Sequence, residues 1–107
     1  MKYEIEITQS AQSDFENIYS YISESLCNRQ AASNLIKLID KDINTLAKVP
    51  EAYPLVNDEY LRNIGIRFIS VKNYIVFYKV NISKQKVYIL RVLYGKRNWV
   101  DILQSEL

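Results

Sequence analysis

Histidine is absent from the 107-residue sequence, and cysteine occurs once, as Cys27. Without histidine the chain lacks the side chain most often used for proton transfer near neutral pH and the commonest metal ligand. A single cysteine excludes an intramolecular disulfide and a structural zinc site built on several thiolates. Any catalysis must therefore use arginine, lysine, tyrosine or carboxylates. We expect no metal and no cofactor, and a reducing compartment.

Long apolar runs and glycine-rich loops are also missing. The N-terminal stretch MKYEIEITQ alternates charged and apolar residues, whereas a signal peptide needs an unbroken apolar centre. No segment approaches the roughly 18 apolar residues of a membrane-spanning helix. The two glycines, Gly65 and Gly95, are too few for a loop that cradles phosphate. We expect a cytoplasmic protein without membrane contact.

The composition that remains is typical of one globular domain. Hydrophobic residues make up 49% of the sequence and charged residues 24%, which separates the chain from disordered sequences. A length of 107 residues is enough to bury one core without help from a metal or a disulfide. We expect residues 1–107 to form a single domain.

Charge is distributed unevenly along the chain. Residues 1–59 carry five basic and ten acidic side chains, whereas residues 60–107 carry nine basic and two acidic ones. Between Tyr60 and Arg97 there is no acidic residue at all. This basic half predicts an anionic partner.

Hydrophobic periodicity predicts a strand followed by two helices. Lys2 to Ile7 alternates as a half-buried strand does, and apolar residues then recur at spacings of three and four up to Leu26. After a short break at Cys27 to Arg29, a second such stripe ends at Val49-Pro50. Because the connection is so short, the two helices should pair as an antiparallel hairpin. Glu51 to Arg62 is predicted to be an irregular loop.

From Ile64 onward the pattern changes to that of strands. The stretches GIRFISV, NYIVFYKV and QKVYILRVLY are rich in β-branched and aromatic residues and are separated by turn residues, which predicts an antiparallel meander. Asn98 can cap a short final helix. The order of elements predicts an α+β fold in which a helical hairpin covers one face of a single sheet.

Arg91 interrupts an apolar face of the last predicted strand. Strict alternation places it with Val87, Ile89 and Leu93, and places Tyr88, Leu90, Val92 and Tyr94 on the opposite face. Either its guanidinium reaches the sheet margin or pairs with a carboxylate from the helices, or it lines a concave anion site. Both interpretations are open.

Two adjacent cations, Lys96 and Arg97, follow Gly95 at the end of this strand and precede the last helix. A helix N-terminus favours anions, so cations placed there suit phosphate, although a solvated basic turn has the same sequence. Arg67 and Lys72 belong to the preceding strands and are candidates to converge on the same place.

Tyrosines and paired carboxylates also have two interpretations each. Tyr74, Tyr78, Tyr88 and Tyr94 lie among the cations, where they suit either unstacked bases or packing of the core. As paired carboxylates, Glu4 and Glu6 are candidates for acid–base chemistry. They are better explained as a solvated strand edge that discourages strand addition.

The whole arrangement resembles a known superfamily. A first strand leading into ITQSAQSDFENIYSYI, a helical hairpin, then GIRFISVKNYIVFYKV and VYILRVLYGKRNWVDIL, is similar to the ParE/RelE superfamily of type II toxin–antitoxin toxins over nearly the whole chain. The resemblance implies a small toxin that a cognate antitoxin wraps and neutralises, in a possible hetero-oligomer.

Two branches of the superfamily imply different targets. RelE-like toxins cut mRNA on the ribosome with arginine, lysine and a C-terminal tyrosine, whereas ParE-like toxins bind DNA gyrase without such a set. Arg97 matches the RelE-like arginine after the last strand. Ile75 stands where a second arginine would be, and Leu103 stands where the tyrosine would be. The long first helix and the strands YIVFYKV and ILRVLYGKR look more like the ParE and plasmid-stabilisation branch.

These considerations define the expected site. The candidate target- or nucleic-acid-binding residues are Arg67, Lys72, Arg91, Lys96 and Arg97. Arg97, Arg91 and Arg67 are the candidates if the chain is a nuclease. A gyrase inhibitor is favoured, with a ribosome-dependent ribonuclease and a non-toxic interaction module as alternatives.

Overall fold

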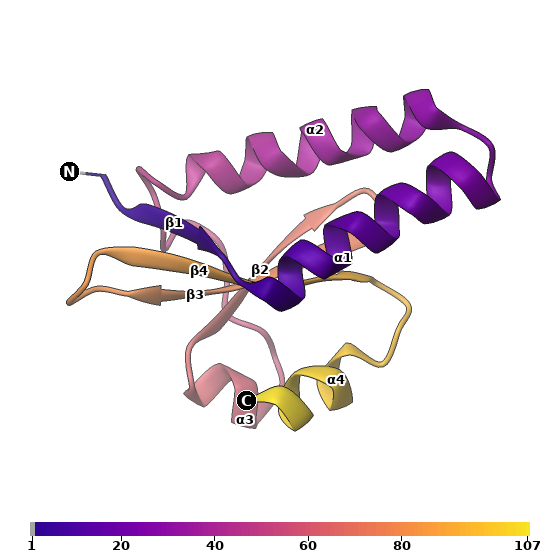
Figure 1. The fold of residues 1–107 in the computed structure, drawn as a ribbon. Helices are drawn as coiled ribbons and strands as arrows, with labels where there is room; N and C mark the ends of the chain where they lie inside the picture. Colours follow the sequence, from indigo (N-terminus) through magenta and orange to yellow (C-terminus); the bar gives the residue numbers. More distant parts are fainter. Residues whose placement is uncertain (1) are drawn as a thin grey trace.

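A four-stranded sheet runs through the centre of the molecule, with helices on both of its faces (Figure 1). The computed structural model describes residues 2–107. Along the chain the elements are β1 (Glu4–Ile7), α1 (Gln9–Ser20), the π-helical segment η1 (Tyr21–Ser25), α2 (Arg29–Thr45), α3 (Glu59–Asn63), β2 (Ile66–Val71), β3 (Tyr74–Asn81), β4 (Lys86–Tyr94) and α4 (Trp99–Glu106). The predicted α+β fold is confirmed.

The strands lie in the order β1-β4-β3-β2. β2, β3 and β4 form the predicted antiparallel meander, and β1 pairs with β4 in parallel, with Glu4 opposite Lys86 and Ile7 opposite Ile89. The first and the last strand of the chain therefore lie side by side.

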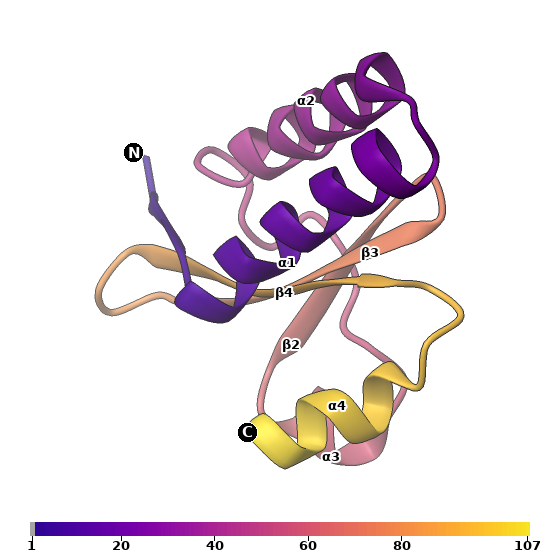
Figure 2. The same ribbon diagram turned by 45° about the vertical axis from the view of Figure 1, so that its right-hand side comes forward.

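The helical hairpin of α1, η1 and α2 covers one face of the sheet (Figure 2). Thr8 caps α1 by accepting a hydrogen bond from the Ala11 amide at 3.2 Å, and Asn28 caps α2 through the Ala31 amide at 3.0 Å. Such caps satisfy amides that have no partner inside the helix. Between the helices Cys27 adopts φ 51°, which ends the first helical segment and turns the chain back.

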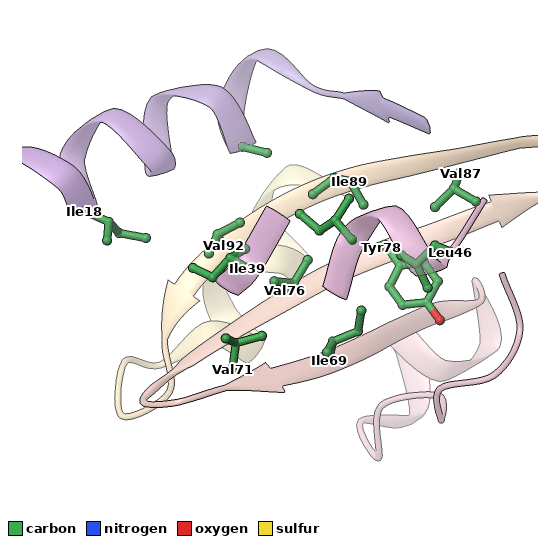
Figure 3. Packing of buried hydrophobic residues seen from close by; sticks show 12 residues of the cluster. Ile18, Ile39, Leu46, Ile69, Val71, Val76, Tyr78, Val87, Ile89 and Val92 are labelled. Atoms are coloured by element: carbon green, nitrogen blue, oxygen red, sulfur yellow. The ribbon is translucent and has the colours of Figure 1, made fainter. Parts of the chain in front are cut away.

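The first core lies between this hairpin and the sheet (Figure 3). Its buried side chains come from α1, from α2 and from all three strands of the meander, and they include Ile39, Ile43, Val76, Tyr78 and Ile89. The apolar stripes predicted for the two helices are the residues that supply the helical side of this core.

A second core lies on the opposite face of the sheet, beneath α3 and α4 (Figure 1). Its buried residues are Val56, Leu61, Ile66, Phe77, Leu93 and Leu103. The prediction that 51–62 is an irregular loop is wrong at its end, because α3 begins there. Asp58 caps α3 by accepting from the Leu61 amide at 3.0 Å, and the side chain of Leu61 is fully buried.

A β-bulge in β4 changes which face its residues occupy. Phe77 pairs with Arg91, but the next residue of β3, Tyr78, pairs with Ile89, so Leu90 is an extra residue in β4. Beyond the bulge, Val92 joins the first core and Leu93 the second. The strict alternation expected for this strand is therefore wrong beyond Leu90.

No helix within residues 2–107 combines the length and the apolar character needed to cross a membrane.

Candidate functional site

A groove of about 1090 Å³ lies between the tip of the helical hairpin and the end of the sheet where β3 begins and β4 ends. Most of its lining is apolar. The hairpin side includes Tyr21, Ile22, Leu26, Leu35 and Leu38, and the sheet side includes Tyr74, Val92 and Tyr94. Because Tyr21 and Leu26 are more than half exposed, large apolar side chains of the groove face solvent.

Three exposed cations stand where the sheet ends. Lys72 and Arg97 line the apolar groove, and Lys72 and Lys96 line an adjoining hollow of about 240 Å³. We call these three residues the basic tip. Within residues 2–107 none of the three forms an ion pair, so their charges face solvent or a partner.

The backbone around Gly95 brings the tip together. The Gly95 amide donates a hydrogen bond to the Asn73 carbonyl at 2.7 Å, which ties the end of β4 to the turn between β2 and β3. A Cβ at Gly95 would lie 3.3 Å from that carbonyl oxygen, closer than a side chain normally packs. Lys72 has φ 55° in the same turn. Glycine therefore allows the close approach that places Lys72 beside Lys96.

Two tyrosines separate the groove from the smaller hollow, and both line each of them. The rings of Tyr74 and Tyr94 meet edge to face, with centroids 5.7 Å apart. Tyr94 is 38% exposed, whereas burial, with smaller contributions from Tyr21 and Tyr94, raises the pKa of Tyr74. Tyr74 thus supports the ring of Tyr94, which remains accessible.

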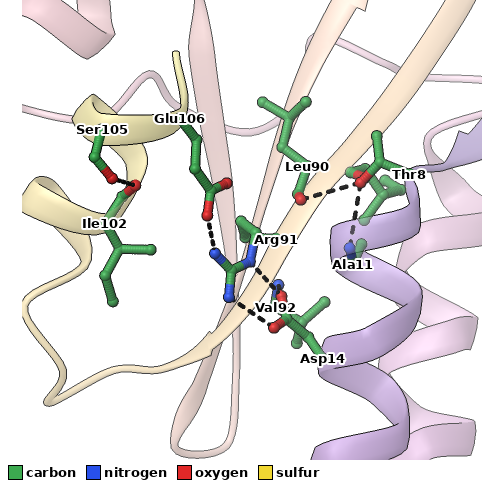
Figure 4. A network of polar contacts seen from close by, with 10 residues as sticks. Thr8, Ala11, Asp14, Leu90, Arg91, Val92, Ile102, Ser105 and Glu106 are labelled. Atoms are coloured by element: carbon green, nitrogen blue, oxygen red, sulfur yellow. Dashed lines mark hydrogen bonds and ion pairs between the residues drawn. The ribbon is translucent and has the colours of Figure 1, made fainter.

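Arg91 bridges α1 and α4 and lines neither the groove nor the hollow (Figure 4). Its Nε and Nη2 donate to the two carboxylate oxygens of Asp14 in α1, at 2.7 and 2.8 Å, and its Nη1 donates to Glu106 in α4. The hydrogen bond to Asp14 raises the pKa of Arg91 further. Of the two interpretations open for Arg91, the structure shows pairing with carboxylates from the helices.

Asp14 is the residue that the sequence interpretation missed. It is buried, and besides Arg91 it accepts a hydrogen bond from the Val92 amide at 2.9 Å, on the edge of β4 that extends beyond β1. The signal was present: Asp14 lies three residues after Ala11 and four before Ile18, on the buried stripe of the helix. A carboxylate on an apolar helix face predicts a buried cation opposite.

Arg67 is also engaged elsewhere. Its guanidinium donates to the Tyr53 carbonyl at 2.6 Å and pairs with Glu51 at 3.4 Å. Of the five predicted binding residues, the structure therefore brings Lys72, Lys96 and Arg97 together and holds Arg67 and Arg91 in separate ion pairs. Their roles in binding or catalysis stay predictions.

The remaining candidates lie outside the groove. Tyr78 is fully buried and donates to the Pro50 carbonyl at 2.9 Å, and Lys86 lies between Glu4 and Glu6, at 3.7 and 3.5 Å. The two glutamates raise the pKa of Lys86. Among residues 2–107 no group of three or more cysteine or acidic side chains is placed to hold a metal ion.

Solved structures with the same fold belong to toxins and toxin–antitoxin complexes. A structure described as the chromosomal ParDE TA system from P. aeruginosa matches with a TM-score of 0.73 and 18% identity, over 89% of this chain and 98% of that one. The E. coli toxin RelE, a mutant in the free state, matches with a TM-score of 0.63 and 18% identity over 100% of both chains. The toxin–antitoxin complex RelBE2 from Mycobacterium tuberculosis matches with a TM-score of 0.59 and 17% identity, over 88% and 99%.

The sequence itself identifies the family. No curated protein matches it, but residues 5–99 match the model of the ParE toxin of the type II toxin–antitoxin system parDE. The match spans most of the chain and confirms the resemblance to the ParE/RelE superfamily. The chain therefore belongs to the family of ParE toxins of type II toxin–antitoxin systems.

Proposed function

We propose that this toxin arrests growth by binding DNA gyrase, without chemistry of its own, and that a cognate antitoxin neutralises it. The observation that carries the proposal is the state of the two positions that resemble catalytic ones. Leu103 is fully buried in the second core, and Ile75 packs against the same core. Neither position offers a charged or proton-transferring group to a bound strand.

The arginines support the same conclusion. Cleavage of a phosphodiester without histidine or metal requires several groups preorganised around the reacting phosphate. Arg91 is held by Asp14 and Glu106, and Arg67 is held by Glu51 and the Tyr53 carbonyl. Of the three candidate arginines, Arg97 alone remains unpaired within residues 2–107. One arginine beside two exposed lysines suits binding of an anion better than cleavage of a phosphodiester.

A purified-protein assay tests the gyrase proposal directly. The toxin should inhibit supercoiling of relaxed plasmid by gyrase at the concentrations that stop growth. In cells, induction without antitoxin should lower incorporation of labelled thymidine before that of labelled methionine. Unchanged supercoiling at growth-arresting concentrations contradicts the proposal, and absence of growth arrest favours a non-toxic interaction module.

A ribosome-dependent ribonuclease is the second candidate, because E. coli RelE shares the fold over the full length of both chains. It predicts that methionine incorporation falls first. Primer extension on mRNA from induced cells would then show new cuts in register with codons, and their absence contradicts this candidate.

The apolar groove supports the antitoxin part of the proposal. Two of the related structures are described as a toxin–antitoxin system or complex. A groove lined by aliphatic and aromatic side chains, with Lys72 and Arg97 at its mouth, fits an apolar segment that carries acidic residues.

A substitution at the exposed edge of the groove tests this docking. Leu26→Glu should remain toxic but escape rescue by the antitoxin, because Leu26 is 56% exposed and the new charge would meet an acidic, apolar segment. Ile82→Glu, in the turn before β4 and 61% exposed, is the control and should be rescued. Equal rescue of both variants would contradict docking in the groove.

A further inference from the structure

The cations of the basic tip have no acidic partner within residues 2–107, and they lie close together at one end of the sheet. In the basic half, Arg67, Lys86 and Arg91 are each paired with a carboxylate. Lys72, Lys96 and Arg97 are exposed and form no ion pair within residues 2–107, yet they gather at one end of the sheet. Like charges brought together in this way raise the positive potential locally and favour an anionic ligand.

Acidic side chains do not offset this potential. Among the described residues that line the groove or the hollow, Asp14 is the one acidic residue, and its two carboxylate oxygens are occupied by Arg91 and the Val92 amide. The charge of Asp14 is therefore neutralised within the fold, and the groove mouth and the hollow remain positive.

The smaller hollow suits a phosphate better than a protein segment. Its volume of about 240 Å³ is far below that of the groove, and besides Lys72 and Lys96 it offers the polar residues Ser70 and Asn73. Tyr94 forms the wall between the hollow and the groove, and its supported ring is 38% exposed. Proteins that bind single strands place cations beside accessible aromatic rings. The cations contact the sugar–phosphate backbone, and an unpaired base stacks on the ring.

We propose that the basic tip binds a single nucleic-acid strand, with phosphates on Lys72, Lys96 and Arg97 and a base against the ring of Tyr94. This inference rests on the proposed function, since it names the chemistry that the toxin contacts on its target: the nucleic acid that the target carries, in addition to protein. An antitoxin segment in the groove therefore competes with the strand for Lys72 and Arg97, which line the groove.

Fluorescence anisotropy of the purified full chain tests the proposal. The probes are a labelled 20-nucleotide DNA strand, an RNA strand of the same sequence, the corresponding duplex DNA and a labelled 20-residue polyglutamate. The variant K72Q/K96Q/R97Q removes the tip, and K37Q/K41Q/K48Q removes three exposed cations on and after α2. Thermal unfolding of both variants checks that neither has lost its fold.

The tip variant should bind the DNA strand at least tenfold more weakly than the unmodified chain. Its plot of log affinity against log salt should be less steep by about two, because each phosphate contact on a single strand contributes about 0.7 to the slope. The control variant should change affinity less than threefold. Equal losses in the two variants, or no strand binding at low salt, would overturn the proposal.

Two further comparisons identify the ligand. Tyr94→Leu should weaken binding of single strands by about fivefold or more while leaving the duplex unaffected, because only an unpaired base stacks. Tighter binding of the RNA or of the DNA strand identifies the source of the nucleic acid. If polyglutamate binds as tightly as the strands and depends on the same three residues, the tip is a site for acidic peptide and the proposal is wrong.

The strand-binding assay can fail or succeed independently of the gyrase assay that tests the proposed function. The binding assay contains neither gyrase nor ribosomes, so strand binding can be present when supercoiling is unaffected. Inhibited supercoiling by a chain that does not bind strands would support gyrase inhibition and overturn only the inference about the tip.

Discussion

Asp14 decides the role of Arg91. An arginine on a strand face is free to contact a ligand only if no carboxylate of the fold reaches it, and here the contact is bidentate, with Nε and Nη2 each within 2.8 Å of an oxygen. The same carboxylate completes the hydrogen bonding of β4 at the Val92 amide, beyond the end of β1. One buried side chain thus joins α1 to the sheet and removes a cation from the surface.

Loss of this carboxylate should be costly. Asp14→Ala leaves a largely buried guanidinium and the buried Val92 amide without their partner, so we expect the free energy of unfolding to fall by about 3–5 kcal/mol. Glu106→Ala removes the more exposed partner of Arg91 and should cost less than about 1 kcal/mol. Urea denaturation measures both, with the exposed Glu16→Ala as control. Similar losses for Asp14 and Glu106 would contradict this ranking.

Tyr78 makes the stability of the fold depend on pH in the alkaline range. Burial raises its pKa from 10.0 to about 12, so the folded state keeps the phenol proton longer than the unfolded state does. The contribution of this group to stability is complete below pH 10 and is lost as the pH rises toward 12. Tyr78→Phe should lose about 1 kcal/mol with the hydrogen bond to Pro50. Its stability should also fall less steeply between pH 10 and 12 than that of the unmodified chain, as denaturant titration at several pH values would show.

At the scale of elements, α4 closes the second core. Trp99 packs on Phe77 with ring centroids 5.0 Å apart, and Leu103 is fully buried. The C-terminal turn is fixed by polar contacts, from Gln104 to Asp58 and from Tyr60 to the Leu107 carbonyl. A helix of this length is marginal alone, so these contacts with β3, β4 and α3 account for its stability.

Truncation of Leu103 measures the contribution of α4. Leu103→Ala should reduce the free energy of unfolding by about 2–5 kcal/mol, because it leaves a cavity in a packed core. Ile82→Ala, at an exposed position, should change it by less than about 0.5 kcal/mol. A small effect at Leu103, measured by the same denaturation experiment, would mean that α4 is not part of the cooperative unit.

Element type was predictable wherever the hydrophobic period was sustained. The two long helices and three strands follow directly from spacings of three to four and of two. The five residues of α3 are too few to display a period, and their signal lies in the Asp58 cap instead. The bulge at Leu90 could not be predicted, because a bulge in an apolar strand has no distinctive composition. Its extra residue moves the residues that follow it to the face opposite the one that strict alternation predicts. The sequence therefore left both interpretations of Arg91 open. It gave no signal that Arg67 would pair with Glu51 and lie apart from the basic tip.

At the scale of the whole molecule, the fold separates charge that is used internally from charge that is presented outward. Three cations of the basic half, Arg67, Lys86 and Arg91, are paired with carboxylates, and all of these carboxylates except Glu106 belong to the acidic half. The basic tip is left at one end of the sheet, beside the apolar groove. Three of the unpaired cations of the basic half are thus gathered on one surface.

Toxicity should depend on this surface more than on net charge. Arg97→Ala should weaken growth inhibition by several-fold, whereas Lys37→Ala, which removes the same charge from the exposed side of α2, should leave it unchanged. Growth curves at matched toxin levels measure the effect. Equal effects of the two substitutions would mean that the position of the charge has no functional role.

The parallel pairing of β1 with β4 has a consequence for biosynthesis. The Thr8 hydroxyl donates a hydrogen bond to the Ile89 carbonyl, 81 residues later in the sequence. During synthesis β1 therefore has no strand to pair with until β4 has been made. Closing so long a loop is slow, because the entropy of the intervening chain is lost before the contacts between the two strands form. A chain in which β4 has not yet been made therefore lacks the partner of β1, and the sheet is completed only after β4 has been synthesised.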